Sequence, residues 1–270
     1  NIQQWHIILI SVIITLVLFY FQPKGTDNVS AVFGPVMVVW FLTLAISGAV
    51  SLFHYPMVLK AINPIYFITF FKNNGFAGFL ILSEVILCAT GAEALYADMG
   101  HLGKKPIIRA WYIIFFALVL TYLGQGAFIL SHQPVKNVLF SMVQNESTLV
   151  YIPFLIVAIL ATIIASQALI SGVFSVIYQG VTTRIFPRVK VDFTSTKLKS
   201  QIYIGGVNWI LMTAVIFILL VFKKSENLAA AYGLAVTGTM CITALMMILI
   251  YYIRKERLSY IVAFLILFVD

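Results

Sequence analysis

The residues of this sequence with the clearest chemical potential are Glu93 and Thr90, which lie in an otherwise apolar stretch at 76–103. A carboxylate in the hydrocarbon of a membrane is costly unless it is paired, protonated or facing water, so such a group points to function. Thr90 precedes Glu93 by three residues, so their oxygens share a face on a helix. Gly91 lies between them, where a spanning helix can break and free its backbone carbonyls. These groups together make an all-oxygen site that suits a hard cation.

The composition of the whole chain predicts that this stretch is one of several membrane spans. The 270 residues are 62% hydrophobic and 10% charged, with a net charge of +8 and a mean hydropathy of +1.04. A soluble domain of this length cannot bury so much apolar surface, whereas a bundle of membrane helices need not. The basic charges fall in short loops between apolar runs, so they indicate membrane topology rather than nucleic-acid binding. Both cysteines, Cys88 and Cys241, fall in apolar runs, where they serve as small buried hydrophobes.

The apolar runs predict about eight spans, joined by polar segments. Pro35 is expected in the first turn of the second span, where its missing N–H does little harm. Residues 54–74 predict a short helix lying in the membrane interface, and residues 132–148 predict a polar loop. The predicted spans are 5–21, 33–53, 76–103, 110–131, 151–179, 203–222, 228–252 and a last one that starts near 260. The fifth is longer than one crossing requires.

Lysine and arginine are distributed unevenly between the two sets of loops. The loops after the odd-numbered spans hold twelve of the 17 basic residues, and the loops after the even-numbered spans hold five. Because cytoplasmic loops carry the excess of Lys and Arg, the first set is predicted to be cytoplasmic. It includes the basic loops 98–109, 180–201 and 253–257. The first span therefore enters from outside, and Glu93 lies deeper in the membrane than Asp98.

Several motifs, in order along nearly the whole chain, resemble the KUP/HAK/KT potassium uptake permeases. The most specific is TGAEALYADMGHLG, which contains Thr90 and Glu93 and is followed by PIIRAW and LTYLGQGA. Others are FGPVMVVWF, ALATIIASQALISGVFS, QIYIGGVNWILM and NLAAAYGLAVTGTM. One departure is Leu102, where that family usually has an aromatic residue.

The resemblance implies an all-α polytopic transmembrane helix bundle with the inverted-repeat fold of the LeuT/APC type. The first span here would be the fourth helix of that fold, the third span its broken sixth helix, and the fifth span its eighth. Residues 1–270 would form a single transmembrane transport domain that is incomplete at both ends. The first helices, including the first and third, which supply half of the expected ion site, and the cytoplasmic C-terminal region would lie outside it.

The predicted site residues differ in how well the sequence supports them. Potassium is expected to bind at Thr90 and Glu93, although Thr90 alternatively bonds back to a carbonyl of its own helix and Glu93 alternatively caps a broken helix. The other candidates for the pathway each have a structural alternative. In these alternatives Glu84 lies near the membrane interface, and Asp98 pairs with a basic residue of the adjacent loop. Ser166 and Gln167 contribute to helix packing, and Tyr96 and Tyr232 contribute to aromatic packing.

These observations favour secondary-active potassium uptake coupled to protons as a K+/H+ symport. The alternative is a proton-coupled amino-acid permease of the APC type, which needs donors for a substrate carboxylate where this sequence offers an acid. No His and carboxylate pair has metal-ligand spacing and no nucleotide fingerprint is present, so neither an enzyme nor a cofactor is expected. The expected partners are potassium and protons as substrates and the lipid bilayer of the cell membrane. Nucleic acid is excluded, and a homodimer is left open.

Overall fold

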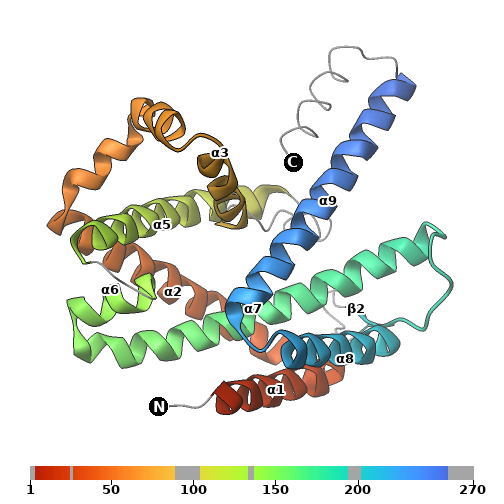
Figure 1. Cartoon of the computed structure of the whole chain (residues 1–270). Helices are drawn as coiled ribbons and strands as arrows, with labels where there is room; N and C mark the ends of the chain where they lie inside the picture. Colours follow the sequence, from red (N-terminus) through yellow and green to blue (C-terminus); the bar gives the residue numbers. More distant parts are fainter. Residues whose placement is uncertain (1–3, 25–26, 89–103, 133–136, 194–201, 255–270) are drawn as a thin grey trace. The chain divides into compact units, whose positions relative to one another are not determined.

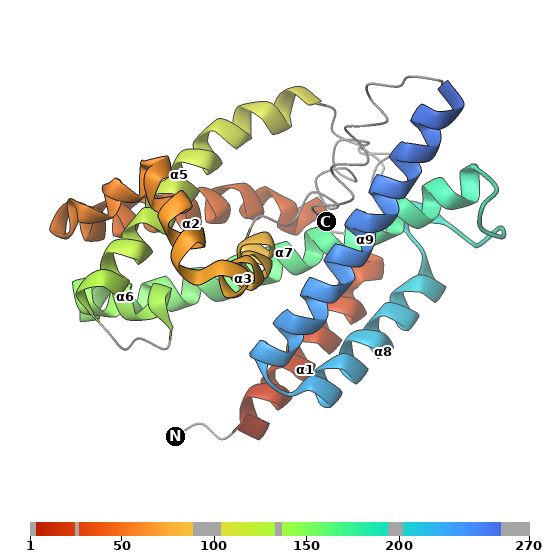
Figure 2. The same cartoon turned by 45° about the horizontal axis from the view of Figure 1, so that its top comes forward.

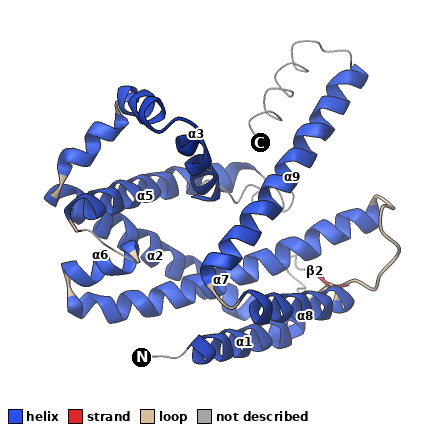
Figure 3. Ribbon diagram, in the orientation of Figure 1, coloured by secondary structure: helices blue, strands red, loops and turns tan. Residues whose placement is uncertain are grey.

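The computed structural model describes residues 4–24, 27–88, 104–132, 137–193 and 202–254, which are almost entirely helical (Figures 1 and 3). The α-helices are α1 (Gln4–Phe21), α2 (Asp27–His54), α3 (Pro64–Cys88), α5 (Lys104–Ser131), α6 (Val138–Glu146), α7 (Thr148–Thr182), α8 (Gly205–Phe222) and α9 (Ser225–Arg254). Two 3-10 helices, η1 (Gln22–Lys24) and η2 (Pro56–Ile62), and two strands, β1 (Asp192–Phe193) and β2 (Ile202–Tyr203), complete the described elements.

Six helices in the described part of the chain are long and apolar enough to cross a membrane: α1, α2, α5, α7, α8 and α9. Many of their apolar side chains point outward, as at Ile113, which is 70% exposed, and Ile210, which is 71% exposed. So extensive an exposed apolar surface is unfavourable in water but is compatible with contact to lipid. The chain is therefore an all-α polytopic membrane protein. The predicted eighth span, and residues 89–103 of the third, lie outside the described residues.

Two of the sequence-based expectations about the elements are wrong. Helix α2 begins at Asp27, not near residue 33, so Pro35 lies in its interior rather than in its first turn. Asp, Asn and Ser are common at helix starts, and the prediction assigned these polar residues to the preceding loop. The expected polar loop at 132–148 contains the nine-residue helix α6. Because this helix is short and contains polar residues, it does not form a long apolar run in the sequence.

The segment expected to hold a short interfacial helix contains η2 and the first part of α3. Pro56 and Pro64 start these two elements, at positions where a missing N–H is tolerated. Gly75 breaks α3 with a φ of 50° and a ψ of −130°. Only glycine adopts this conformation without strain. The predicted start of the third span at Phe76 coincides with this break.

The predicted basic loop at 180–201 begins later than expected, because α7 runs on to Thr182, and its described part contains the strand β1. Strands β1 and β2 pair antiparallel, with Asp192 opposite Tyr203 and Phe193 opposite Ile202. Burial raises the pKa of Tyr203, and the negative charge of Asp192 raises it further. The pairing closes the loop directly before α8 begins.

The described residues belong to two compact units. The larger comprises residues 13–70 and 91–213, and the smaller comprises residues 1–12, 71–90 and 214–270. In the smaller unit the side-chain amide of Gln4 donates to the carbonyl of Lys223 at 3.2 Å, and the Lys223 ammonium lies 5.5 Å from the ring centre of Trp5. These contacts tie the start of α1 to the end of α8.

In the larger unit, α2 and α5 pack closely and run in the same direction (Figures 1 and 2). Gly48 lies against Gly124, and the Ser51 hydroxyl donates to the Gly124 carbonyl at 3.0 Å. His54 lies near His132, further along both helices in the same sense. Small residues permit this approach of two backbones.

A second core of the larger unit forms where α2, α6 and α7 meet. The buried residues Leu44, Val143 and Phe154 form its centre. The rings of Trp40 and Phe140 lie 5.5 Å and 5.8 Å from that of Phe154. This core fixes α6 against the first turns of α7.

Candidate functional site

The predicted ion ligands Thr90 and Glu93, with Tyr96 and Asp98, lie in 89–103, outside the described residues. Glu84 lies on α3, at a position whose side chain is not described. Their roles stay predictions. The structure describes three of the other candidates, namely Ser166 and Gln167 on α7 and Tyr232 on α9.

The middle of α7 is a continuous helix in which hydroxyl groups bond to their own backbone. Ser166 donates to the Thr162 carbonyl at 2.9 Å, and Thr162 donates to the Ala158 carbonyl at 2.8 Å. Such bonds satisfy a hydroxyl in an apolar span without a partner helix. The proton of Ser166 is therefore already used, and only its oxygen lone pairs remain for a ligand.

Gln167 differs from its neighbour, because its Oε1 is buried and no residue in the described part of the chain donates to it. A buried acceptor without a donor costs about 1–3 kcal/mol. Buried polar groups in proteins normally have a partner, so each exception asks for a water or an ion. This observation favours Gln167 over Ser166 as an oxygen ligand within α7.

Two further buried amides, which the sequence analysis missed, belong to the same unit. Asn208 near the start of α8 is completely buried, and its Nδ2 donates to the Phe19 carbonyl at 3.1 Å. That bond fixes the orientation of the amide, because a carbonyl only accepts. It leaves the Oδ1 of Asn208 without a donor among the described residues, and the Oε1 of Gln22 is in the same state. A lone amide in the otherwise apolar 203–222 run was the signal for Asn208, whereas Gln22 was assigned to a loop.

One hydrogen bond and the helical spacing of two residues place the three amides next to one apolar cluster, which contains Phe19, Ile170, Phe174 and Tyr203. Gln167 precedes Ile170 by three residues and Phe174 by seven, so it shares their face of α7. Gln22 follows Phe19 by three residues, and Asn208 is bonded to the Phe19 backbone.

The three amides thus provide neutral carbonyl oxygens in apolar surroundings. Neutral oxygens suit a hard cation, but they supply no charge to compensate it. Within the described residues, no group of three His, Cys, Asp or Glu side chains is placed to hold a metal. Tyr232 lies on α9, with its side chain 48% exposed, and its place in a pathway stays a prediction.

Comparison with known proteins gives a match to one family along the full sequence. Residues 1–270 match the family described as the K+ potassium transporter integral membrane domain. The "Probable potassium transport system protein Kup" of Trichlorobacter lovleyi is 66% identical over 268 residues, which are 99% of this chain and 44% of the relative. The "Probable potassium transport system protein Kup 2" of Geobacter metallireducens is 62% identical over 270 residues, covering all of this chain and 45% of the relative. No solved structure matches the chain significantly.

The chain spans less than half the length of these curated relatives. The matches do not support the amino-acid permease alternative. The matched relatives are named as transport proteins rather than enzymes, and the matches agree with the six apolar helices of a multi-pass cell-membrane protein. A match over the entire chain, at this identity, shows that it belongs to the KUP family of potassium transporters.

Proposed function

We propose that this chain forms part of the ion pathway of a secondary-active potassium uptake system, in which potassium enters the cell together with a proton. The observation that carries the proposal is the match of residues 1–270 to the potassium transporter family. Within the matched sequence, Glu93 provides a carboxylate in an apolar span. Thr90 adds a hydroxyl oxygen three residues away. The LeuT/APC-type fold is part of the same proposal.

Proton coupling follows from the chemistry of a carboxylate in an apolar environment. Desolvation favours the protonated, neutral form of Glu93, whereas a bound potassium ion favours the carboxylate. The state of one cation at the site therefore affects the binding of the other, so potassium and proton occupancy are linked. The uncompensated amide oxygen of Gln167 supports an ion path along α7.

The parallel course of α2 and α5 supports the membrane topology of this proposal. Two helices that cross a membrane in the same direction require an odd number of crossings between them. The residue pairs Ser51–Gly124 and His54–His132 give α2 and α5 this common direction. The proposed third span, which carries Glu93, supplies the return crossing.

The test is uptake of rubidium by the full-length transporter in cells that lack other potassium uptake systems, together with their growth at limiting potassium. Glu93→Gln keeps the size of the side chain and removes its charge, so we expect it to abolish concentrative uptake while the protein still reaches the membrane. Glu226→Gln, at an exposed acid in the first turn of α9, is the matched control and should behave like the parent. Normal, pH-responsive uptake by Glu93→Gln would remove this residue from the mechanism.

A further inference from the structure

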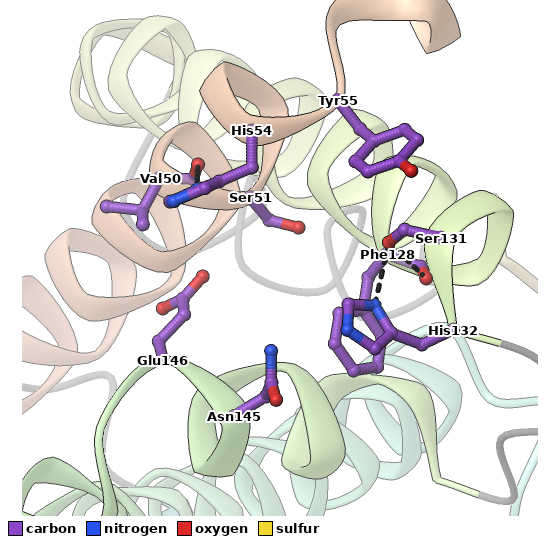
Figure 4. A pocket seen from close by; sticks show the side chains of 9 residues that line it. All are labelled: Val50, Ser51, His54, Tyr55, Phe128, Ser131, His132, Asn145 and Glu146. Carbon is purple, nitrogen blue, oxygen red and sulfur yellow. Dashed lines mark hydrogen bonds between the residues drawn. The ribbon is translucent and has the colours of Figure 1, made fainter.

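A pocket of about 430 Å³ lies where the ends of α2, α5 and α6 meet, within the larger unit (Figure 4). None of its lining residues is one of the three amides Gln22, Gln167 and Asn208, or one of the predicted ion ligands Thr90 and Glu93. The pocket lies at the ends of α2 and α5, which the distribution of lysine and arginine predicts to be on the outer side of the membrane. An ion that arrives from outside would therefore meet this pocket before it enters the membrane.

Among the described lining residues, Glu146 is the only carboxylate, and it is the last residue of α6. Its side chain points into the pocket on the side of His54 (Figure 4). Among the described residues, no lysine or arginine lies within ion-pair distance of Glu146; the ion pair found joins Lys190 and Asp192. Partial burial raises the pKa of Glu146 to about 7, and the positive charge of His54 limits that rise.

Two histidines line the same pocket, and hydrogen bonds constrain them. The Nδ1 of His54 lies 2.8 Å from the Val50 carbonyl. Since a carbonyl only accepts, this Nδ1 carries a proton, and the neutral ring keeps a lone pair on Nε2. The Nδ1 of His132 lies 2.7 Å from the Ser131 hydroxyl, and its ring stacks on Phe128 at 4.6 Å.

The net charge of the pocket follows from these groups. Tyr55 is the remaining titratable residue of the described lining. Helix α7, which also packs against α6, has no charged side chain along its length. When both histidines are neutral, the ionised described lining carries one negative charge, and when His54 is protonated its positive charge offsets that of Glu146. The Asn145 amide and the Ser51 oxygen add neutral polar groups to it.

We propose that this pocket binds a hydrated monovalent metal cation at Glu146, in competition with a proton. The free energy that disfavours the isolated carboxylate is recovered when a cation lies beside it. One carboxylate matches one positive charge, whereas calcium sites normally combine several carboxylates and carbonyls. Because one water occupies about 30 Å³ in the liquid, the pocket has room for an ion with part of its hydration shell.

The test is protection of a cysteine from a neutral maleimide, which reports occupancy without requiring transport. Asn145→Cys is introduced into the full-length transporter after its native cysteines are replaced, and labelling is measured with potassium or with the bulky N-methylglucamine cation at equal ionic strength. We expect potassium to slow labelling in a saturable manner. The concentration for half-protection should rise at least about tenfold for each pH unit below the pKa of the carboxyl, because protonation of His54 or His132 also opposes binding of a cation. Val50→Cys is a second reporter on the pocket wall, in case the first variant fails to fold.

Three comparisons make the result decisive. Glu146→Gln should abolish protection, and Glu226→Gln should leave it unchanged. Glu93→Gln should keep protection even where it abolishes uptake, so failure of the proposed transport role and failure of this outer site are distinguishable. Absence of protection in both reporters, protection that survives Glu146→Gln, or protection by zinc but not by potassium would overturn the proposal.

Discussion

Gly48 and Gly124 lie against each other where α2 and α5 meet. The backbone of Gly48 occupies the space that a Cβ atom on Gly124 would need, and the backbone of Leu120 occupies the space that a Cβ atom on Gly48 would need. A Cβ on Gly48 would also lie 2.8 Å from the Cα of Thr121. These neighbours are backbone atoms, which cannot rotate away as a flexible side chain can. The contact therefore sets the separation of the two helices, and with it the geometry of the pocket at their ends.

Gly48→Ala is expected to destabilise the protein, because the added methyl group forces the helices apart. Overpacking of this kind typically costs about 1–3 kcal/mol. Gly34→Ala on the same helix is the matched control, since nothing lies within 4 Å of its Cβ position and alanine favours helix formation. Thermal unfolding of the full-length protein in detergent measures both variants. Equal midpoints would show that the close contact is not needed.

Asn208→Leu is expected to lower stability by about 1–3 kcal/mol, because it removes the buried donor to the Phe19 carbonyl. Thr213→Val, on the same helix, removes an exposed hydroxyl that bonds to the Trp209 carbonyl one turn earlier, and it should change stability little. The measurement is again thermal unfolding in detergent. A loss of the same size in both variants would indicate a general intolerance of α8 to substitution.

The raised pKa of Glu146 predicts a pH dependence of stability with a definite sign. The folded protein holds the proton up to about pH 7, whereas the unfolded chain releases it near 4.5. Between these values the folded state binds more protons, so stability contributed by this group is present below 4.5 and is lost as pH rises through 7. Glu146→Gln should therefore gain stability relative to the parent above pH 7, and not near pH 4.5. A constant difference across that range would contradict the assignment.

Substitutions along the proposed ion path should have graded effects on rubidium uptake. Thr90→Val removes one neutral ligand, so we expect a weaker apparent affinity for potassium with less loss of maximal rate than for Glu93→Gln. Glu84→Gln should have the mildest effect if that carboxylate lies in an outer vestibule. Uptake normalised to protein in the membrane, at several external pH values, provides the comparison. A larger effect of Glu84→Gln than of Glu93→Gln would reverse the proposed order.

The distribution of basic residues predicts the side of the membrane on which two loops lie. A cysteine at Ser195, in the basic loop 180–201, should be labelled by an impermeant thiol reagent only after the cells are opened. A cysteine at Ser225, the first residue of α9, should be labelled in intact cells. Labelling of Ser195→Cys from outside would invert the topology, and would also place the pocket beside Glu146 in the cytoplasm.

Most of the helices could be predicted, because membrane spans depend on length and hydropathy more than on tertiary contacts. The predicted range 5–21 differs from α1 by one residue at its start, and 228–252 differs from α9 by a few residues at each end. Helix α6 was missed because it is short and mixed in character. Its place depends on packing against Phe154.

The described parts of the site were less predictable than the helices. Ser166 and Gln167 are adjacent and look alike in sequence, yet the first bonds to its own helix and the second has a buried acceptor without a donor. To predict the pocket around Glu146, one would need to know that α2 and α5 run in the same direction. Contacts between residues distant in the sequence, such as Ser51 with Gly124, decide that direction.

The length of α7 has a consequence for the lipid around the protein. A helix of 35 residues extends about 52 Å at 1.5 Å per residue, whereas the hydrocarbon core of a bilayer is about 30 Å thick. A helix this long and this apolar relieves the mismatch by tilting or by thickening the adjacent bilayer. The tilt of α7, and the position of Gln167 across the membrane, should therefore respond to acyl-chain length, which makes bilayer thickness a variable that acts on this protein.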